Sequence, residues 1–252
     1  MNTYLRFFIV AVFIWPLVMW GVGPGDVLAQ SNSGVIYEEA PQDDALAAQW
    51  YQKAADQGHP GAQFNLGLMY YNGEGVPRDQ AQAAQWFRKA AEQGHPEAQC
   101  NLGLMYENGQ GVPRDQALAV QWYQRAAEQG DLGAQFNLGL IYYNGGGMPR
   151  NLAQAAQWFR RAADQGDPGA QLMLGAMHYD GVGATQNYAL AAQWFRKAAE
   201  QGNPEAQFGL GLMYESGEGV PRDQALAAQW LRKAAGQGNQ EAQAKLKEMG
   251  LD

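Results

Sequence analysis

Apolar residues recur with helical spacing along most of the chain. One set stands at i, i+3, i+4, i+7 and i+8, which places it on one face of an α-helix: Ala83, Trp86, Phe87, Ala90 and Ala91. Asp79 suits the N-cap of this helix and Gly94 suits the left-handed residue after its end. A second pattern, Ala62, Leu66, Met69 and Tyr70, predicts another helix that Gly73 ends. No segment alternates with period two, so we expect no β-strand.

The whole pattern repeats every 36 residues. Six tryptophans mark the period: Trp50, Trp86, Trp122, Trp158, Trp194 and Trp230. "AAQWFRKAAEQG" around Trp86 returns almost unchanged around the others, and "AQFNLGLMYYNG" from Ala62 keeps the same period. Helix pairs this short cannot bury their apolar faces alone, so adjacent pairs must stack. We therefore predict an all-α fold, an α/α solenoid (superhelix) of 36-residue helix-turn-helix repeats with the tryptophans in its core.

The two ends of the array are visible in the sequence. "APQDDALAAQW" from Ala40 matches a second helix alone, and "AQAKLKEMG" puts Lys245 and Lys247 where the first repeat has Asn65 and Gly67. A lysine in place of that glycine is typical of a terminal cap. The solenoid is thus predicted over residues 41–252, with five full units and half units at both ends.

The N-terminus is predicted to direct export. Arg6 precedes an apolar run over residues 7–23, and "VLA" permits cleavage after Ala29. We expect a signal peptide at 1–29 and a flexible lead at 30–40. The alternative is an uncleaved segment that anchors the N-terminus in a membrane.

The repeat motif resembles a known family. Ala-x-x-x-Leu-Gly-x-x-Tyr, Gly-x-Gly-x-x-x-Asp and Ala-x-x-Trp-x-x-Lys-Ala-Ala-x-x-Gly follow one another five times, and together they resemble the Sel-one-like repeat family, a relative of the tetratricopeptide repeats. The resemblance implies an adaptor whose first helices line a concave face. Some secreted members rich in paired cysteines have been linked to β-lactam binding and hydrolysis, but this chain has only Cys100.

Composition and candidate chemistry argue against an enzyme. The net charge of -8 gives no basic face for nucleic acid. Serine stands at three positions and threonine at two, without Ser-x-x-Lys or Gly-x-Ser-x-Gly. The histidines lack partners at ligand spacing: His59 and His95 suit helix N-caps, and His178 replaces a tyrosine, either by drift or as a specific contact. We expect no catalytic residues, no metal and no cofactor, and we interpret Cys100 as an apolar residue.

"NGEGVPRD" from Asn72 has a glycine pair and a nearby arginine, which are features of phosphate-binding loops. It follows a helix, lacks Gly-Lys-Ser/Thr and returns in every repeat, which indicates a turn. In the fourth copy Gln186 replaces the arginine while both glycines stay. The glycines and the following Asp or Asn are therefore expected to carry the turn.

The first helix of each repeat is more apolar than one packing face requires. A second stripe on it suits peptide recognition in a groove, but could equally be core between stacked units at Phe64 and Leu68. We expect Tyr71 and Tyr143 to be exposed, and the divergent fourth repeat is either drift or a contact point. The candidate groove residues are Phe64, Leu68, Tyr71, Asn72, Leu104, Asn108, Phe136, Leu140, Tyr143, Asn144, His178, Tyr179 and Asp180.

Together these features predict a periplasmic or secreted repeat protein. We expect a monomer that binds a protein or peptide through its concave groove as an adaptor or regulator. It should bind no nucleic acid and have no stable membrane insertion after signal cleavage. The first alternative is a cell-envelope role that engages peptidoglycan or its remodelling enzymes, and a weaker one is a β-lactam hydrolase.

Overall fold

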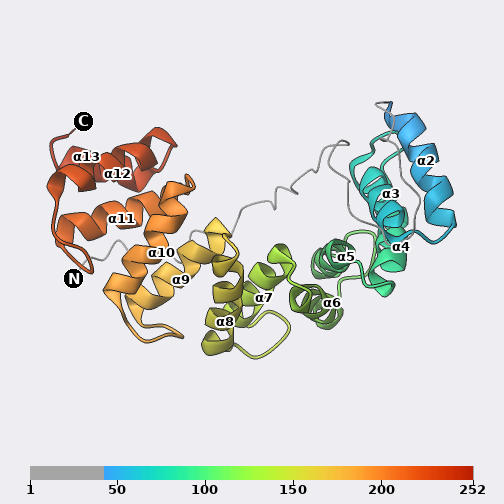
Figure 1. The fold of residues 1–252 in the computed structure, drawn as a ribbon, viewed down its shortest axis with the longest axis horizontal. Coiled ribbons are helices and arrows are strands. Elements are labelled where there is room, and N and C mark those ends of the chain that lie inside the picture. Colours follow the sequence, from blue (N-terminus) through green and yellow to red (C-terminus); the bar gives the residue numbers. More distant parts are fainter. Residues whose placement is uncertain (1–42, 252) are drawn as a thin grey trace. The chain divides into compact units, whose positions relative to one another are not determined.

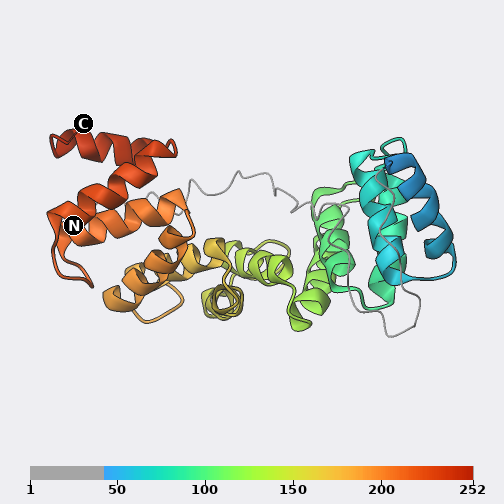
Figure 2. The ribbon, with the colours of Figure 1, turned by 45° about the horizontal axis from the view of Figure 1, so that its top comes forward.

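A computed structural model describes residues 43–251, which form twelve α-helices and no β-strand. Figure 1 shows the helices following one another as antiparallel pairs, and Figure 2 shows the same pairs from another direction. The all-α solenoid is confirmed, with five helix pairs, α2 alone before them and α13 after them. The helices are α2 (Asp44–Asp56), α3 (Pro60–Asn72), α4 (Gln80–Glu92), α5 (Pro96–Asn108), α6 (Gln116–Glu128), α7 (Leu132–Asn144), α8 (Leu152–Asp164), α9 (Pro168–Asp180), α10 (Tyr188–Glu200), α11 (Pro204–Ser216), α12 (Gln224–Gly236) and α13 (Gln240–Glu248).

The helices fall into two compact units. The N-terminal unit contains α2 to α6, and the C-terminal unit contains α7 to α13. Within each unit the most extensive packing joins the first and second helix of one repeat, such as α3 with α4 or α11 with α12. The signal peptide expected at 1–29 and the lead expected at 30–40 lie outside the described residues. None of the helices described is long and apolar enough to cross a bilayer.

The helix ends follow the sequence signals. Asp79 caps α4, because its Oδ1 accepts from the main-chain N–H of Ala81 at 2.9 Å and of Gln82 at 3.0 Å. Pro96 takes the first position of α5, where its missing N–H costs no helical hydrogen bond. Gly73 ends α3 in the left-handed conformation, with φ of 83°.

The centre of each helix pair is the residue that follows the tryptophan. In five pairs this side chain is almost completely buried: Phe87, Tyr123, Phe159, Phe195 and Leu231. Each lies against a glycine of the first helix; a Cβ on Gly139 would stand 2.5 Å from the Phe159 ring. The glycine thus makes room mainly for a side chain of its own repeat.

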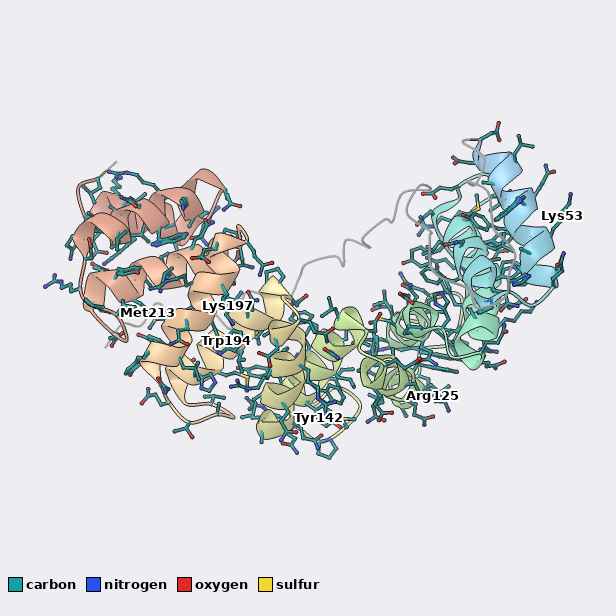
Figure 3. All side chains as sticks on the ribbon, in the orientation of Figure 1. Lys53, Arg125, Tyr142, Trp194, Lys197 and Met213 are labelled. Carbon is teal, nitrogen blue, oxygen red and sulfur yellow. The ribbon has the colours of Figure 1, made fainter. Side chains whose placement is uncertain are left out.

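The tryptophans lie at the edge of the core, so the prediction that all six are core residues is only partly right. Trp86 and Trp194 are buried, while the other four are half-buried. A lysine or arginine three positions later covers the indole; Figure 3 shows Lys197 beside Trp194, with Nζ 4.1 Å from the ring centroid. Such a cation over an aromatic face adds attraction and shields it from water.

The C-terminal cap is a short helix with charged residues where the earlier repeats pack. Lys247 of α13 is exposed, although the equivalent Gly67 and Gly103 are buried. Lys245 of α13 forms an ion pair with Glu215 of α11, with 2.9 Å between the nitrogen and the oxygen. This ion pair lies where an earlier repeat would have packed its next first helix. The polar ending at residues 245–247 agrees with the terminal role predicted for it.

Candidate functional site

In the N-terminal unit the second stripe of the first helices is partly open to solvent. Phe64, Leu68 and Tyr71 of α3 are half-buried, and so are Cys100 and Leu104 of α5. We call these five residues the α3–α5 stripe. The asparagines at the helix ends, Asn72 and Asn108, are exposed. Part of this apolar surface therefore remains available for a contact.

The same stripe changes character within the C-terminal unit. Phe136 and Leu140 of α7 are half-buried and Asn144 is exposed. In the last two complete repeats the equivalent residues are 8% exposed or less and share one core cluster: Leu172, Ala176, Phe208 and Leu212. There the stripe is core, as one of the two interpretations had it.

Tyr143 corrects the expectation that this tyrosine is exposed. Its side chain is 7% exposed and belongs to the core cluster around Phe159. The turn after each first helix, which we call the elbow, places one residue beside the tyrosine of the preceding repeat. For Tyr71 this residue is Gln110, and for Tyr143 it is Val182, which packs against the same cluster. An apolar residue in place of a polar one lets the tyrosine ring be covered.

His178 is a buried, hydrogen-bonded residue of the fold. Its side chain is 7% exposed, so it offers little surface to a partner. Arg160 Nη2 donates to Nε2 at 3.2 Å, which makes Nδ1 the protonated nitrogen that donates to the Thr185 carbonyl at 3.1 Å. Arg88 of α4 donates to the hydroxyl of Tyr106 of α5 in the same way at 2.6 Å. The histidine therefore replaces a tyrosine and keeps its hydrogen bond.

Tyr179 joins the fourth repeat to the fifth. Its hydroxyl donates to Glu218 Oε2 at 2.5 Å, and its ring meets Tyr188 edge-on at 5.0 Å between centroids. Burial raises the pKa of Tyr179, and the Glu218 carboxylate raises it further. Tyr179 and its neighbour Asp180 are both half-buried. Tyr71 makes the corresponding contact with Gln110 at 3.2 Å, so these tyrosine hydroxyls are used between repeats.

The elbow "NGEGVPRD" is held by its own hydrogen bonds. The Asp79 N–H donates to the Tyr70 carbonyl at 2.8 Å, and Arg78 Nε donates to the Tyr71 carbonyl at 3.1 Å. Gln186 makes the same contact to the Tyr179 carbonyl at 3.0 Å. A Cβ on Gly75 would overlap the main chain of Asp44. The segment is a turn as predicted, and its arginine position also serves the turn.

A set of buried glutamines escaped the sequence analysis. Gln99 of α5 donates Nε2 to the Ala91 carbonyl at 3.0 Å and accepts from Gln129 Nε2 at 2.7 Å. Glutamine is usually exposed, which is why its burial was not expected. The available signal was its repetition after the alanine that opens each first-helix block: Gln63, Gln99, Gln135, Gln171 and Gln207.

The titratable groups near the stripe form no reactive site. Burial raises the pKa of the Cys100 thiol well above its usual value, and Asp131, which accepts its hydrogen bond, raises it further. The thiol is therefore protonated at neutral pH and a poor nucleophile. Burial lowers the pKa of His95, against the opposing effect of Glu97 and Asp131. Among residues 43–251 no group of His, Cys, Asp and Glu could hold a metal ion.

The model of a known repeat family matches this chain six times. The Sel1 repeat model matches residues 27–59, 60–95, 96–131, 133–167, 168–203 and 204–239. The first match includes residues 27–42, which lie outside the described part. A curated sel1-like repeat-containing protein of Acanthamoeba polyphaga mimivirus is 42% identical over 62 residues, 23% of this chain and 12% of that protein.

Several solved structures share the fold. A protective antigen of uropathogenic Escherichia coli strains with an SLR fold is 46% identical, with a TM-score of 0.81 over 84% of this chain. A Sel1 repeat protein from Oxalobacter formigenes is 40% identical, with a TM-score of 0.75 over 83% of this chain. The chain spans 45% and 60% of those two chains, so both relatives are considerably longer.

Proposed function

Because this chain belongs to the Sel1 repeat family, whose members mediate protein–protein interactions, we propose that it is an exported adaptor that binds a protein or peptide through its first-helix surface. One observation carries the proposal. Phe64, Leu68 and Leu104 stay half-buried in the N-terminal unit, whereas the same positions of the last two complete repeats are closed by packing. Apolar surface left next to water is typical of a surface that a partner covers.

Export to the periplasm is the second part of the proposal. It rests on the sequence of residues 1–29, in which Arg6 and the apolar run at 7–23 precede a small-residue exit at Ala29. Fractionation of a Gram-negative host that expresses the full chain should find it in the periplasm, with a mature N-terminus at Gln30. A chain retained in the cytoplasm would contradict export, and an intact N-terminus in the membrane fraction would indicate an anchor.

Partner binding is tested by capture with matched variants. We expect Leu68→Gln and Leu104→Gln to lose the proteins that the purified chain captures from an envelope extract, identified by mass spectrometry. Leu118→Gln is the control, because Leu118 is also a half-buried leucine of the N-terminal unit but belongs to the second helix α6. Thermal melts by circular dichroism verify that all three variants fold. Equal capture by all variants would place the interaction elsewhere.

A further inference from the structure

The second helices of the C-terminal unit carry a band of exposed cations. In α8, α10 and α12 the two residues after the buried phenylalanine or leucine are both basic, and all six side chains are exposed. We call them the basic band: Arg160, Arg161, Arg196, Lys197, Arg232 and Lys233. The only carboxylates on these three helices are Asp164 and Glu200. The band is therefore strongly positive in a chain whose net charge is -8.

The first cation of each pair is fixed by a group that lies later in the chain. The Nη2 atoms of Arg160, Arg196 and Arg232 donate to His178 Nε2 at 3.2 Å, to the Tyr214 hydroxyl at 2.9 Å and to the Leu251 carbonyl at 3.5 Å, respectively. None of these three acceptors is a carboxylate. A guanidinium has five N–H donors, so each arginine keeps donors and charge for another molecule.

The second cation of each pair lies over the tryptophan of its own helix. The charged group stands 4.4 Å from the ring centroid for Arg161 over Trp158, and 4.1 Å for both Lys197 over Trp194 and Lys233 over Trp230. Arg160 also approaches the Trp194 ring, at 5.8 Å, and α10 and α12 share one core cluster, so the band continues across the three helices. Side chains that are restrained before binding lose less conformational entropy in a complex.

The charge of the band is not used for ion pairs within the described part of the chain. No residue of the band forms an ion pair with a carboxylate among residues 43–251, where ion pairs are formed by His95 and Lys245. Asp164 and Glu200 are exposed and stand one turn beyond Arg161 and Lys197 without forming one. Six fixed cations without ionic partners favour an anionic molecule at this surface.

The equivalent helices of the N-terminal unit have no such excess of positive charge. Gln52 and Gln124 stand where α8, α10 and α12 have their first arginine. The helices α2, α4 and α6 hold four cations, Lys53, Arg88, Lys89 and Arg125, and as many carboxylates, Asp44, Asp56, Glu92 and Glu128. The same fold thus supplies a matched surface on which the charges are balanced.

We propose that the basic band binds an acidic segment of a protein partner, in which aspartate or glutamate side chains recur. Clusters of arginine recognise acidic motifs through hydrogen bonds assisted by charge, and complementary charge gives specificity and faster association. The band lies on second helices, apart from the α3–α5 stripe. The inference therefore adds a second contact surface to the proposed adaptor.

An acidic segment fits the band better than an anionic membrane does. A bilayer would meet the chain as a whole, whose net charge of -8 is repelled by anionic lipids, whereas a short segment meets only the local cations. Membrane contact is also strengthened by apolar side chains that enter the headgroup region. The exposed large apolar residues of the described part are Leu46 and Leu132, and neither lies on α8, α10 or α12.

Three labelled peptides test the inference with the purified full chain. They have the same length and the same spacing of glycine, and carry glutamate, glutamine or lysine at the remaining positions. In fluorescence anisotropy the glutamate peptide should bind at least about tenfold more tightly than the glutamine peptide, and the lysine peptide most weakly. Raising the salt from about 0.05 to about 0.5 M should remove most of this preference, because it shortens the screening length.

Two matched triple variants locate the binding surface. Arg161→Gln, Lys197→Gln and Lys233→Gln together should weaken binding of the glutamate peptide about tenfold. The control is Lys53→Gln, Lys89→Gln and Arg125→Gln, which removes the same charge from the equivalent positions of the N-terminal unit; it should change the affinity less than about twofold. Thermal melts by circular dichroism verify folding. Arg196→Gln with Arg232→Gln leaves the indole contacts in place and should weaken the same peptide.

The other outcomes overturn the inference in distinguishable ways. Equal binding of the three peptides by the natural chain would refute acidic recognition without any variant. An equal loss in both triple variants would assign the effect to net charge rather than to the band. Sedimentation with vesicles of phosphatidylcholine and phosphatidylglycerol should show no binding; vesicle binding that the first triple variant abolishes, without a peptide preference, would identify a membrane instead. Envelope capture with Leu68→Gln tests the proposed function separately, because these substitutions leave the α3–α5 stripe unchanged.

Discussion

Gln93 and Gln63 are joined side chain to side chain, with Nε2 of Gln93 2.7 Å from Oε1 of Gln63. Gln63 also donates its Nε2 to the Ala55 carbonyl at 3.1 Å. One buried amide thereby connects α3 to the end of its partner α4 and to the end of the preceding helix α2. Equivalent glutamine pairs recur in the later repeats, so the same polar contact fixes the stacking of successive helices.

Removing one buried glutamine should destabilise the chain. Gln99→Met removes the hydrogen bonds to the Ala91 carbonyl and from the Gln129 amide. Both groups keep another partner, the Gly94 N–H and the Arg125 carbonyl, so each lost hydrogen bond should cost about 0.5–1.5 kcal/mol. Urea unfolding measures the loss. The control is Gln243→Met in α13, where the glutamine is exposed, and it should cost less than about 0.5 kcal/mol. Equal losses of unfolding free energy in the two variants would show that the buried glutamine pair adds no stability beyond that of an exposed glutamine.

A methyl group on a first-helix glycine should overpack the repeat. A Cβ at residue 139 would press on the Phe159 ring, so Gly139→Ala should lower the unfolding free energy by about 1–3 kcal/mol. Gly61→Ala tests the same change in α3 where nothing lies within 4 Å of the new Cβ. It should be neutral or stabilising, because alanine favours a helix over glycine. A melting temperature unchanged in Gly139→Ala would contradict the tight contact.

Adjacent aromatic residues on α8 should contribute unequally to the free energy of unfolding. Phe159 is fully buried, whereas Trp158 is half-buried under Arg161, whose Cζ lies 4.4 Å from the indole centroid. Phe159→Ala should cost about 3–5 kcal/mol as a core truncation, and Trp158→Ala about 1–2 kcal/mol, since less area returns to water. Calorimetry of both variants shows which substitution lowers the unfolding free energy more. A larger loss for Trp158→Ala would restore the tryptophan as the core residue.

Stability should fall in mild acid through His95. Burial lowers the pKa of His95 in the folded chain, while the unfolded chain takes up a proton near pH 6.5. The unfolded state therefore binds more protons as the pH drops below about 6.5, and stability is lost from there down to the folded pKa. Above pH 6.5 the contribution is fully present. His95→Asn keeps an N-cap residue of the kind found at Asn203.

The measurement compares unfolding free energies of the two proteins between about pH 8 and pH 5. The natural chain should lose stability more steeply than His95→Asn in the lower half of this range. Parallel profiles for both proteins would show that His95 does not contribute to the pH dependence.

The candidate surface was only partly predictable from the sequence. The period of 36 residues identified the equivalent positions of all repeats, but equivalence in sequence did not guarantee equal exposure. Leu68 and Leu212 share a position, yet Leu68 is half-buried and Leu212 is core. Tyr71 and Tyr143 differ in the same way, because the elbow residue above each is polar in one case and apolar in the other. Exposure depends on the neighbouring repeat, which a single position does not reveal.

The sequence by itself determined the helices, their ends and the repeat. Period 3.6, an Asp or Asn cap and a left-handed glycine are local properties, so Asp79 and Gly73 set the boundaries of α4 and α3 from their own chemistry. Only the tertiary structure decided which aromatic residue is fully buried. Phe159 is buried and Trp158 is not, because Phe159 packs against Gly139 of the paired helix. The tertiary structure likewise buried Gln99, because the carbonyl and amide that satisfy it come from two other helices.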